Sequence, residues 1–270
     1  MGAIDVWAQI TTARIAERPW MATLYRWTGR DHEYQLPSVD STLQEMDRSG
    51  VDLALLSAWH GPEGCLISNE EVSKQIEQAP SRFRGLASVD LYRPMEAVRE
   101  IRRWVDCKRF VGVRVVPWLW DLPPNDRRYY PIYSTCIDLG VPFCTQIGHT
   151  GPLKRSETGR LIPYLEEVML EFPELKVVGG HVGFPWIDEL VTMTVKFPNF
   201  YVDTSAYALH RLPSAFVDWM KGLGKTRVMF GTNWPMLSPR RCLEGLSGLG
   251  LSDEATEAFL SGNARRVFGL

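Results

Sequence analysis

The sequence is poor in histidine and cysteine, carries almost no net charge and contains no long apolar run. Its 270 residues include 5 His and 5 Cys, and 30 Lys and Arg offset 32 Asp and Glu to leave a formal charge of -2. Without a basic block, the chain lacks the charge pattern of a protein that binds nucleic acid or an anionic membrane. No apolar run approaches the roughly 20 residues of a membrane helix, and Met1 is not followed by a secretory signal. We therefore expect a cytoplasmic protein.

The cysteines are scattered and odd in number, at Cys65, Cys107, Cys136, Cys144 and Cys242. No two of them have a C-x-x-C spacing, so the sequence predicts neither a disulfide framework nor a zinc ribbon. We expect reduced thiols, with Cys144 as an inert buried side chain. In contrast, tryptophan is abundant, with 10 residues against 5 histidines.

Short apolar runs rich in β-branched residues recur along the chain and predict strands. Near-continuous apolar runs are typical of strands that are buried on both faces of a parallel sheet. The predicted strands are Ala3–Ile10, Val51–Ser57, Arg84–Asp90, Phe110–Val116, Val141–Ile147, Leu175–His181, Phe200–Ser205 and Arg227–Thr232.

Helical patterns separate most of these runs. Ser68 and Glu71 form a capping-box pattern, Asp40 is a candidate cap before another helix, and Gly50 and Gly140 suit helix ends. The predicted helices are Ser41–Ser49, Ser68–Ala79, Pro94–Asp106, Tyr130–Leu139, Pro163–Phe172, Pro185–Phe197, Pro213–Leu223 and Ser252–Phe268.

Strands that alternate with helices in this number favour a (β/α)₈ TIM barrel, formed as a single domain by residues 1–270. The alternative is a doubly wound open sheet. That fold usually brings a glycine-rich phosphate loop, and the chain has neither G-x-G-x-x-G nor a Walker A motif. The connections at residues 12–37 and 117–128 are long, and barrel enzymes place substrate contacts in such loops.

In a barrel, the residues at the carboxyl ends of the strands meet at one mouth, where active sites lie. Here that set includes three of the five histidines and six of the ten tryptophans. Its members are Trp7, Gln9, Ser57, Trp59, His60, Asp90, Arg114, Trp118, Trp120, Asp121, Gln146, His149, His181, Trp186, Asp203, Ser205, Asn233 and Trp234.

Four motifs carry a family resemblance: His181-Val-Gly-Phe-Pro-Trp186, Val202-Asp-Thr-Ser205, Gly231-Thr-Asn-Trp-Pro235 and Gly262-Asn-Ala-Arg-Arg-Val-Phe-Gly-Leu270. With them, the chain resembles the amidohydrolase-2 branch of the amidohydrolase superfamily. That branch includes enzymes similar to aminocarboxymuconate-semialdehyde decarboxylase and resorcylate decarboxylase, and related lactonases. The resemblance implies a divalent metal at the mouth, bound by a His-x-His pair on strand one, a His after strand five, often a His on strand six, and an Asp ending strand eight.

The implied metal ligands are incomplete in this chain. Trp7 and Gln9 replace the His-x-His pair, and Asn233 replaces the Asp, whereas His149 and His181 remain. Indole is not a metal ligand, and neutral amide oxygens suit hard cations better than zinc. We therefore favour an enzyme without a cofactor. The alternative is zinc or manganese held by His149 and His181, with help from Gln9 or Asn233.

Without a metal, other groups must carry the chemistry. We expect His149 and His181 to act as general acid and base. Arg114 would bind a carboxylate or oxyanion, and Asn233 completes the catalytic candidates. The remaining candidates are Asp90 or Asp203 as orienting carboxylates, Tyr129 or Tyr130 as proton donors, and a Cys65–His60 nucleophilic pair.

Tryptophan at a former ligand position predicts a large apolar surface at the mouth. Aromatic pockets bury apolar ligands, and a few polar groups set the ligand's orientation. We expect the substrate to be a small, flat, apolar or aromatic carboxylate or carbonyl compound. The predicted substrate-binding residues are Trp7, Gln9, Trp59, Trp118, Trp120, Gln146, Trp186 and Trp234.

Three hypotheses about function remain open. The first is a metal-independent hydrolase or lyase of a specialised pathway, and the second is a metal-dependent hydrolase or decarboxylase. The third is a binding protein or pseudoenzyme, suggested by the replaced ligand positions. The expected partner is a small molecule, and the tryptophan content leaves room for a homo-oligomer.

Overall fold

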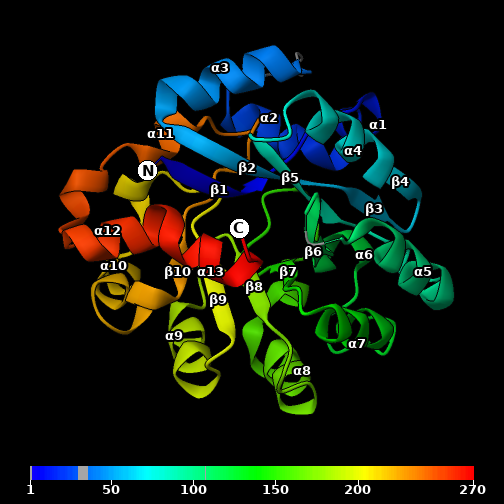
Figure 1. Ribbon diagram of the computed structural model, residues 1–270. Helices are drawn as coiled ribbons and strands as arrows, with labels where there is room; N and C mark the ends of the chain where they lie inside the picture. Colours follow the sequence, from blue (N-terminus) through cyan, green and yellow to red (C-terminus); the bar gives the residue numbers. More distant parts are fainter. Residues whose placement is uncertain (1, 30–35, 107) are drawn as a thin grey trace.

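The computed structural model describes residues 2–29, 36–106 and 108–270. Its main sheet has eight strands in the order β1-β2-β5-β6-β7-β8-β9-β10, and every pair of neighbours in that order is parallel. The strands are β1 (Ala3–Ala8), β2 (Val51–Ser57), β5 (Phe83–Ala87), β6 (Phe110–Arg114), β7 (Phe143–Gln146), β8 (Val177–Gly180), β9 (Phe200–Asp203) and β10 (Val228–Met229). Figure 1 shows them as an inner ring surrounded by helices.

The sheet closes between its first and last strands. The backbone N–H of Val6 donates to the carbonyl of Phe230 at 3.0 Å, and that of Gln9 donates to the carbonyl of Trp234 at 3.0 Å. This closure excludes the doubly wound open sheet and confirms the predicted (β/α)₈ barrel. Each predicted strand is present, although several are shorter than expected.

Helices follow the strands and cover the outside of the barrel (Figure 1). The capping box of Ser68 and Glu71 is confirmed at the start of α4. The helices are α3 (Val39–Ser49), α4 (Asn69–Gln78), α5 (Pro94–Trp104), α7 (Tyr130–Leu139), α8 (Glu166–Glu171), α9 (Ile187–Lys196), α10 (Ser214–Lys221), α11 (Pro239–Leu243), α12 (Asp253–Glu257) and α13 (Asn263–Phe268).

Several predicted helix boundaries were wrong, including the start of α9, which begins at Ile187 rather than at Pro185. The cap of α3 is Ser38, whose side chain accepts from the N–H of Ser41, so this helix begins before Asp40. Backbone at Ile162 is extended, and the regular helix therefore begins only at Glu166. The C-terminal helix is divided by a π-helical turn, η7 (Ala258–Gly262).

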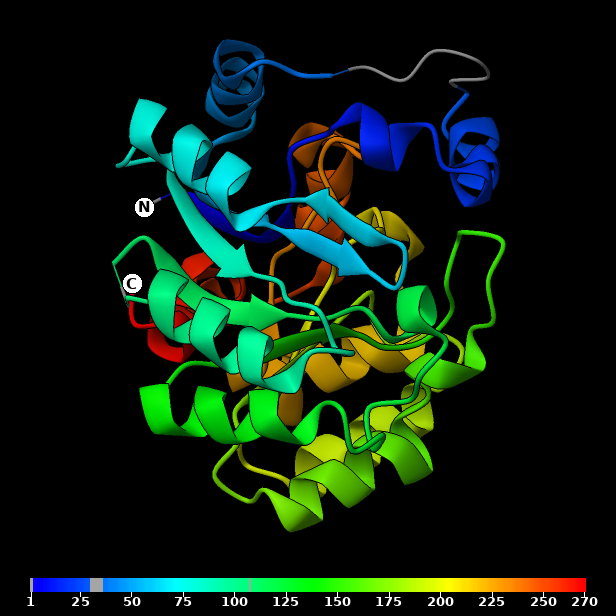
Figure 2. The ribbon, with the colours of Figure 1, turned by 90° about the vertical axis from the view of Figure 1, so that its right-hand side faces the viewer.

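Short elements near the carboxyl ends of the strands were not predicted. They include the antiparallel hairpin β3 (Trp59–Gly61) and β4 (Gly64–Ile67), and the helices α1 (Ala13–Ala16), η1 (Pro19–Met21), α2 (Ala22–Trp27) and α6 (Pro117–Trp120). Figure 2 shows the hairpin and α2 at the end of the barrel opposite the two chain termini. The remaining short helices are η2 (Glu157–Gly159), η3 (Leu161–Leu165), η4 (Leu209–Arg211), η5 (Leu223–Thr226) and η6 (Leu246–Leu249).

The barrel interior changes character along its axis. At its amino end, apolar side chains such as Ile4, Leu55 and Met229 pack together, and α13 covers them through Val267 and Phe268. Toward the other end, the buried residues include polar and charged side chains, namely Asp5, Arg114, His181, Asp203 and Ser205. The apolar core therefore stabilises the amino end of the barrel, whereas buried polar and charged groups lie at its carboxyl end.

None of the helices in the described ranges is long and apolar enough to span a membrane. Four cysteines within these ranges are free thiols, and burial raises the pKa of Cys144 to about 12. Cys107 lies outside the described residues.

Candidate active site at the barrel mouth

A cavity of about 720 Å³ opens at the carboxyl ends of the strands. Its walls are mainly aromatic and aliphatic. Among the described residues that line it there is no Asp or Glu, whereas two arginines are present. The lining residues used below are Gln9, Trp20, Trp27, Trp59, Trp118, Gln146, His149, His181, Phe184, Tyr207, Arg211, Asn233 and Arg241. Such a surface suits a flat apolar ligand that carries negative charge.

Four of the predicted substrate-binding residues lie on this cavity wall: Gln9, Trp59, Trp118 and Gln146. The indole N–H of Trp118 donates to Oε1 of Gln146 at 2.6 Å, which fixes the plane of the ring. Nε2 of Gln146 in turn donates to the carbonyl of His149 at 3.1 Å. Trp59 packs beside Trp118, with ring centroids 6.0 Å apart.

The other four predicted tryptophans do not line the cavity. Trp120 follows Trp118 by two positions on α6, and such residues do not share a helix face. Its ring stacks on His60 instead, at 5.9 Å. Trp186 precedes α9 and lies beneath the guanidinium of Arg160 outside the cavity.

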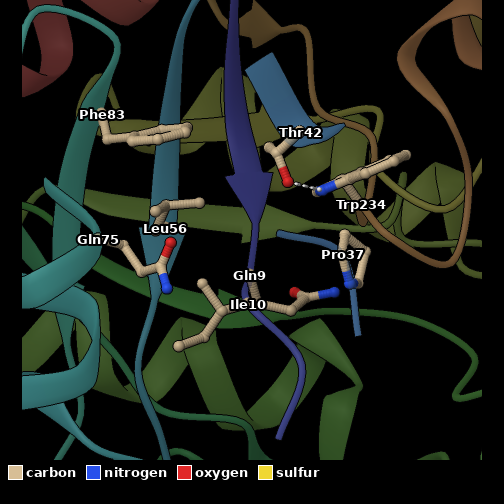
Figure 3. A pocket seen from close by; sticks show the side chains of 8 residues that line it. All are labelled: Gln9, Ile10, Pro37, Thr42, Leu56, Gln75, Phe83 and Trp234. Atoms are coloured by element: carbon tan, nitrogen blue, oxygen red, sulfur yellow. Dashed lines mark hydrogen bonds between the residues drawn. The ribbon is translucent and has the colours of Figure 1, made fainter. Parts of the chain in front are cut away.

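Trp234 lies in a separate small pocket of about 10 Å³, too small for a substrate (Figure 3). Its indole N–H donates to Oγ1 of Thr42 on α3, so the ring is held between the barrel and that helix. Trp7 is fully buried below the cavity, where its ring lies 4.5 Å from that of His181.

Several residues at the cavity rim were not among the predicted substrate-binding residues, although Trp20 and Trp27 lie in the connection at residues 12–37, where we expected substrate contacts. Trp20 packs edge-on against Trp118 at 5.1 Å, and Trp27 stacks on His149 at 6.0 Å. Both come from the long connection after β1, whose length was the only signal in the sequence. Arg211 in η4 and Arg241 in α11 lie well beyond their strand ends, so a search restricted to strand ends missed them.

A buried relay connects His181 to Asp203 through Ser205. Nδ1 of His181 lies 2.6 Å from Oγ of Ser205, and that hydroxyl donates to Oδ1 of Asp203. The N–H of Ser205 also donates to this oxygen, at 2.9 Å, which marks it as an acceptor. Because the single hydroxyl proton is used on Asp203, Ser205 must accept from Nδ1–H of His181. The lone pair of His181 is therefore on Nε2.

Burial and the nearby Arg114 cation lower the pKa of His181 to about 3. The imidazole is consequently neutral near pH 7, and the lone pair of Nε2 is available as a hydrogen-bond acceptor. Its backbone is left-handed, with φ 71°, a conformation that is uncommon for a residue with a side chain. The relay and this backbone fix the orientation of the ring at the cavity floor.

His149 is the second imidazole on the cavity, and it is exposed. The backbone N–H of His149 donates to the carbonyl of Phe184 at 2.6 Å, which holds the loop after β7 against the loop after β8. With one face of the ring on Trp27 and access to water, His149 can exchange protons with solvent.

The structure contradicts the expected role of Arg114 as an anion clamp. The side chain is 1% exposed, and its guanidinium carbon lies 3.7 Å from the centroid of the Trp7 ring, below the cavity. Nη2 donates to the carbonyl of Val6 at 2.9 Å. Burial raises the pKa of Asp203, and Arg114 opposes that rise. Arg114 is thus an internal counter-charge for Asp203.

Gln9 and Asn233 form an amide pair at the floor. Nε2 of Gln9 donates to Oδ1 of Asn233 at 3.0 Å. The backbone N–H of Asn233 donates to the carbonyl of Trp7 at 2.7 Å. Asn233 has φ 71°, a backbone conformation that asparagine tolerates better than most residues. The pair contributes polar groups without net charge.

The remaining candidates lie away from the cavity. His60, Cys65 and Asp90 line a different surface groove. The hydroxyl of Tyr129 is committed to the carbonyl of Leu122 at 3.0 Å, and a hydrogen bond to Glu171 helps to raise the pKa of Tyr130 to about 12. None of these residues can reach a ligand in the cavity.

The side chains at the floor do not fit a transition metal. The Trp7 ring fills the first-strand ligand position so tightly against Gly180 that a Cβ there would overlap it. The guanidinium of Arg114 stacks on that ring, and a second cation beside it would be repelled. Within the described ranges no three His, Cys, Asp or Glu side chains could hold a metal together. A tight site normally needs three or more such ligands.

A closed barrel with a cavity of this kind at the carboxyl ends of its strands defines the class of (β/α)₈-barrel enzymes. The chain belongs to the amidohydrolase family, whose model, described as Amidohydrolase, matches residues 4–270. This match confirms the resemblance inferred from the motifs. It also supports the expectation of an enzyme over that of a binding protein.

Known relatives extend this assignment. The chain is 23% identical to gamma-resorcylate decarboxylase of Polaromonas sp. (strain JS666), over 86% of this chain and 87% of the relative. A solved structure of an uncharacterised TIM-barrel protein from Bordetella bronchiseptica is 25% identical, covers 100% of this chain and 99% of its own, and has a TM-score of 0.84.

A third relative is a dihydroxybenzoic acid decarboxylase from Polaromonas sp. JS666, solved with bound manganese and the inhibitor 2-nitroresorcinol. It is 21% identical, with a TM-score of 0.72 and coverage of 100% of this chain and 97% of its own. This similarity shows the shared fold, and manganese is a property of that protein.

Proposed function

We propose that this enzyme is a lyase that decarboxylates a hydroxylated aromatic acid. The observation that carries the proposal is the cavity: aromatic walls, no Asp or Glu among its described lining residues, and two imidazoles facing it. Decarboxylases among its relatives, including gamma-resorcylate decarboxylase, support this reaction over hydrolysis.

The two histidines have complementary roles in the proposed reaction. Nε2 of neutral His181 accepts a hydrogen bond from a ring hydroxyl, which increases the electron density of the ring. His149 delivers a proton to the ring carbon that bears the carboxylate. The C–C bond then breaks, its electron pair returns to the ring, and CO₂ leaves. The ring hydroxyl keeps its proton throughout, so the net reaction consumes one proton, which His149 takes from water.

We further propose that this reaction needs no resident metal. The support is the donor set: Trp7 occupies one former ligand position, and Oδ1 of Asn233 is bonded to Gln9. Protein produced in medium with manganese should contain far less than one metal per chain, and EDTA should leave turnover unchanged. One manganese per chain, lost together with activity on chelation, would contradict this part of the proposal.

The reaction itself is tested by incubating the protein with 2-hydroxybenzoate or 2,6-dihydroxybenzoate. The expected products are CO₂ and the corresponding phenol, detected by chromatography. In D₂O, deuterium should appear at the carbon that lost the carboxylate. His60→Gln, on the separate groove, is the control that should retain turnover. If aromatic acids neither bind nor react, the proposed function is wrong.

A further inference from the structure

Tyr207 lines the cavity, and the proposed reaction does not use it. Two hydroxyl groups belong to the described lining residues, those of Thr28 and Tyr207. The hydroxyl of Thr28 donates to the carbonyl of Leu24 at 2.9 Å, so it is already bonded within the protein. Tyr207 is partly buried, and burial alone raises its pKa, because no described residue forms a hydrogen bond with its hydroxyl. This phenol is therefore free to bind a ligand.

The turn after β9 brings this side chain to the mouth. β9 ends at Asp203, and the backbone N–H of Ala206 donates to the carbonyl of Thr232 at 3.2 Å, beyond the end of β10. Ala206 has φ 66°, in the left-handed region that a residue with a Cβ rarely adopts. The backbone N–H of Tyr207 then donates to the carbonyl of Thr204 at 3.3 Å and closes the turn. Backbone strain of this kind clusters at functional sites, and here it lies directly before the side chain that lines the cavity.

The same turn carries the hydroxyl that supports His181. Oγ of Ser205 lies 2.6 Å from Nδ1 of His181, and Tyr207 follows Ser205 by two residues. Because β8 and β9 are paired neighbours in the barrel, His181 and Tyr207 reach the cavity from adjacent strand ends. A substrate whose ring hydroxyl donates to Nε2 of His181 therefore has Tyr207 on the side of β9.

The two side chains have complementary hydrogen-bonding roles. Neutral His181 presents an acceptor, Nε2, which suits a ring hydroxyl. Tyr207 is kept neutral by its raised pKa and presents an O–H donor, which suits a carboxylate because an ionised carboxylate only accepts. Other polar groups on the wall are bonded to protein atoms, as are the indole N–H of Trp118 and the amide of Gln146. A carboxylate beside His181 consequently finds a neutral donor in Tyr207.

We propose that the hydroxyl of Tyr207 donates a hydrogen bond to the reacting carboxylate of the substrate and orients it beside His181. This inference rests on the proposed decarboxylation and adds Tyr207 to its substrate-binding residues. Negative charge leaves the carboxylate as the C–C bond breaks, so a strong bond to it would stabilise the ground state more than the transition state. A neutral hydroxyl binds a carboxylate more weakly than a cation does, and it therefore orients the group at a smaller cost in rate.

Binding of two unreactive probes to Tyr207→Phe tests the inference. Benzoate carries the carboxylate but lacks the ring hydroxyl needed for turnover, and phenol carries no carboxylate. Calorimetry should show that Tyr207→Phe binds benzoate about tenfold or more weakly than the wild type, the loss expected for one hydrogen bond to a charged group. Its affinity for phenol should stay within about twofold of the wild-type value. Tyr92→Phe is the matched control, since it removes an exposed hydroxyl outside the cavity lining, and it should change neither affinity.

Each alternative result has a distinct meaning. Tyr207→Phe breaks no hydrogen bond between described residues, so its free energy of unfolding in urea should equal that of the wild type. Unchanged benzoate affinity would show that other groups bind the carboxylate, and equal losses for benzoate and phenol would show that the hydroxyl acts through packing. Either result would overturn the inference and leave the decarboxylase proposal intact.

The substrate itself provides a second measurement. If benzoate does not bind to the wild type while 2-hydroxybenzoate is decarboxylated, the KM for 2-hydroxybenzoate decides. A rise of about tenfold in Tyr207→Phe would support the inference, and an unchanged KM would overturn it. If no aromatic acid binds or reacts, the proposed function fails as well.

Discussion

The floor and the rim of the cavity come from different parts of the fold. We call Gln9, His181 and Asn233 the floor, and Trp20, Trp27, Arg211 and Arg241 the rim. The floor comes from strand ends, and its groups are buried, mutually hydrogen-bonded and neutral toward the cavity, as in the relay of His181, Ser205 and Asp203. The rim comes from connecting segments. Its aromatic and cationic side chains are partly or fully exposed, as are Trp27 and Arg211.

The two regions therefore suit two different tasks, catalysis at the floor and substrate selection at the rim. Rigid strands keep the proton-transfer groups in a fixed geometry, which catalysis requires. Loops and short helices can change residue by residue without loss of the barrel, which makes them suitable for substrate selection. Substitutions at the floor should therefore lower kcat, whereas substitutions at the rim should raise KM.

The largest effect is expected at the floor. His181→Ala removes the group that polarises the ring hydroxyl, and the loss of one such preorganised hydrogen-bonding group costs about 10²- to 10³-fold, so kcat should fall by that factor with the substrate still bound. Steady-state kinetics with 2-hydroxybenzoate and a fluorescence assay of binding would measure both quantities. A variant that keeps more than half of the wild-type kcat would remove His181 from the mechanism.

The second expected effect is on how the free energy of unfolding depends on pH. The pKa of His181 is about 3 in the folded protein and about 6.5 in an unfolded chain. Below pH 6.5 the unfolded chain therefore takes up a proton that the folded protein does not, and folding stability is lost as pH falls toward 3. Between pH 7.5 and pH 5 this linkage costs the wild type about 2 kcal/mol. His181→Gln should remove that cost, as measured by urea unfolding at the two pH values.

Asp5 serves as the control, because its pKa shift changes stability with pH in the opposite direction to that of His181. Burial raises its pKa to about 7, so the folded protein binds a proton between the unfolded pKa and pH 7. Its contribution is greatest at low pH and is lost as pH rises through 7. Asp5→Asn should therefore lower stability at pH 5 relative to the wild type more than at pH 7.5. If both variants shift in the same direction, the assigned ionisation states are wrong.

A smaller effect on kcat is expected for Ser205, which is hydrogen-bonded to His181 below the cavity floor. Ser205→Ala removes the acceptor of Nδ1–H, so the tautomer with a free Nε2 is no longer favoured. Loss of one such hydrogen bond corresponds to about tenfold in kcat, with KM unchanged. Ser205→Thr retains the hydroxyl and should recover part of the rate. A change confined to KM would show that the relay orients substrate rather than the imidazole.

The floor of the cavity could be predicted from the sequence better than its rim. Buried apolar runs and cap residues such as Ser68 identified the strands and most helices, because local sequence determines these elements. His181, Asp203 and Ser205 all stand at strand ends, so the barrel hypothesis placed them together at one mouth.

Side-chain direction was not predictable in the same way. Trp118 and Trp120 have the same sequence signal, yet they are two positions apart on α6, about half a helical turn, and therefore lie on opposite sides of it. Arg114 has the sequence position of a mouth residue, but Trp7 covers it. Arg211 and Arg241 reach the cavity through tertiary contacts between two connecting segments, which no local pattern in the sequence records.

The smallest effect is expected at the outermost aromatic residue. Trp27 is 62% exposed and stacks on His149, so Trp27→Ala removes one face of the substrate entrance without disturbing the floor. An aromatic contact of this kind contributes about 0.5–1.5 kcal/mol, which corresponds to a two- to tenfold increase in KM at nearly constant kcat. Trp104→Ala, on α5 away from the cavity, is the control for tryptophan removal. A fall in kcat with KM unchanged would mean that Trp27 positions His149 for proton delivery, and the rim would then take part in the chemistry that the floor is expected to carry alone.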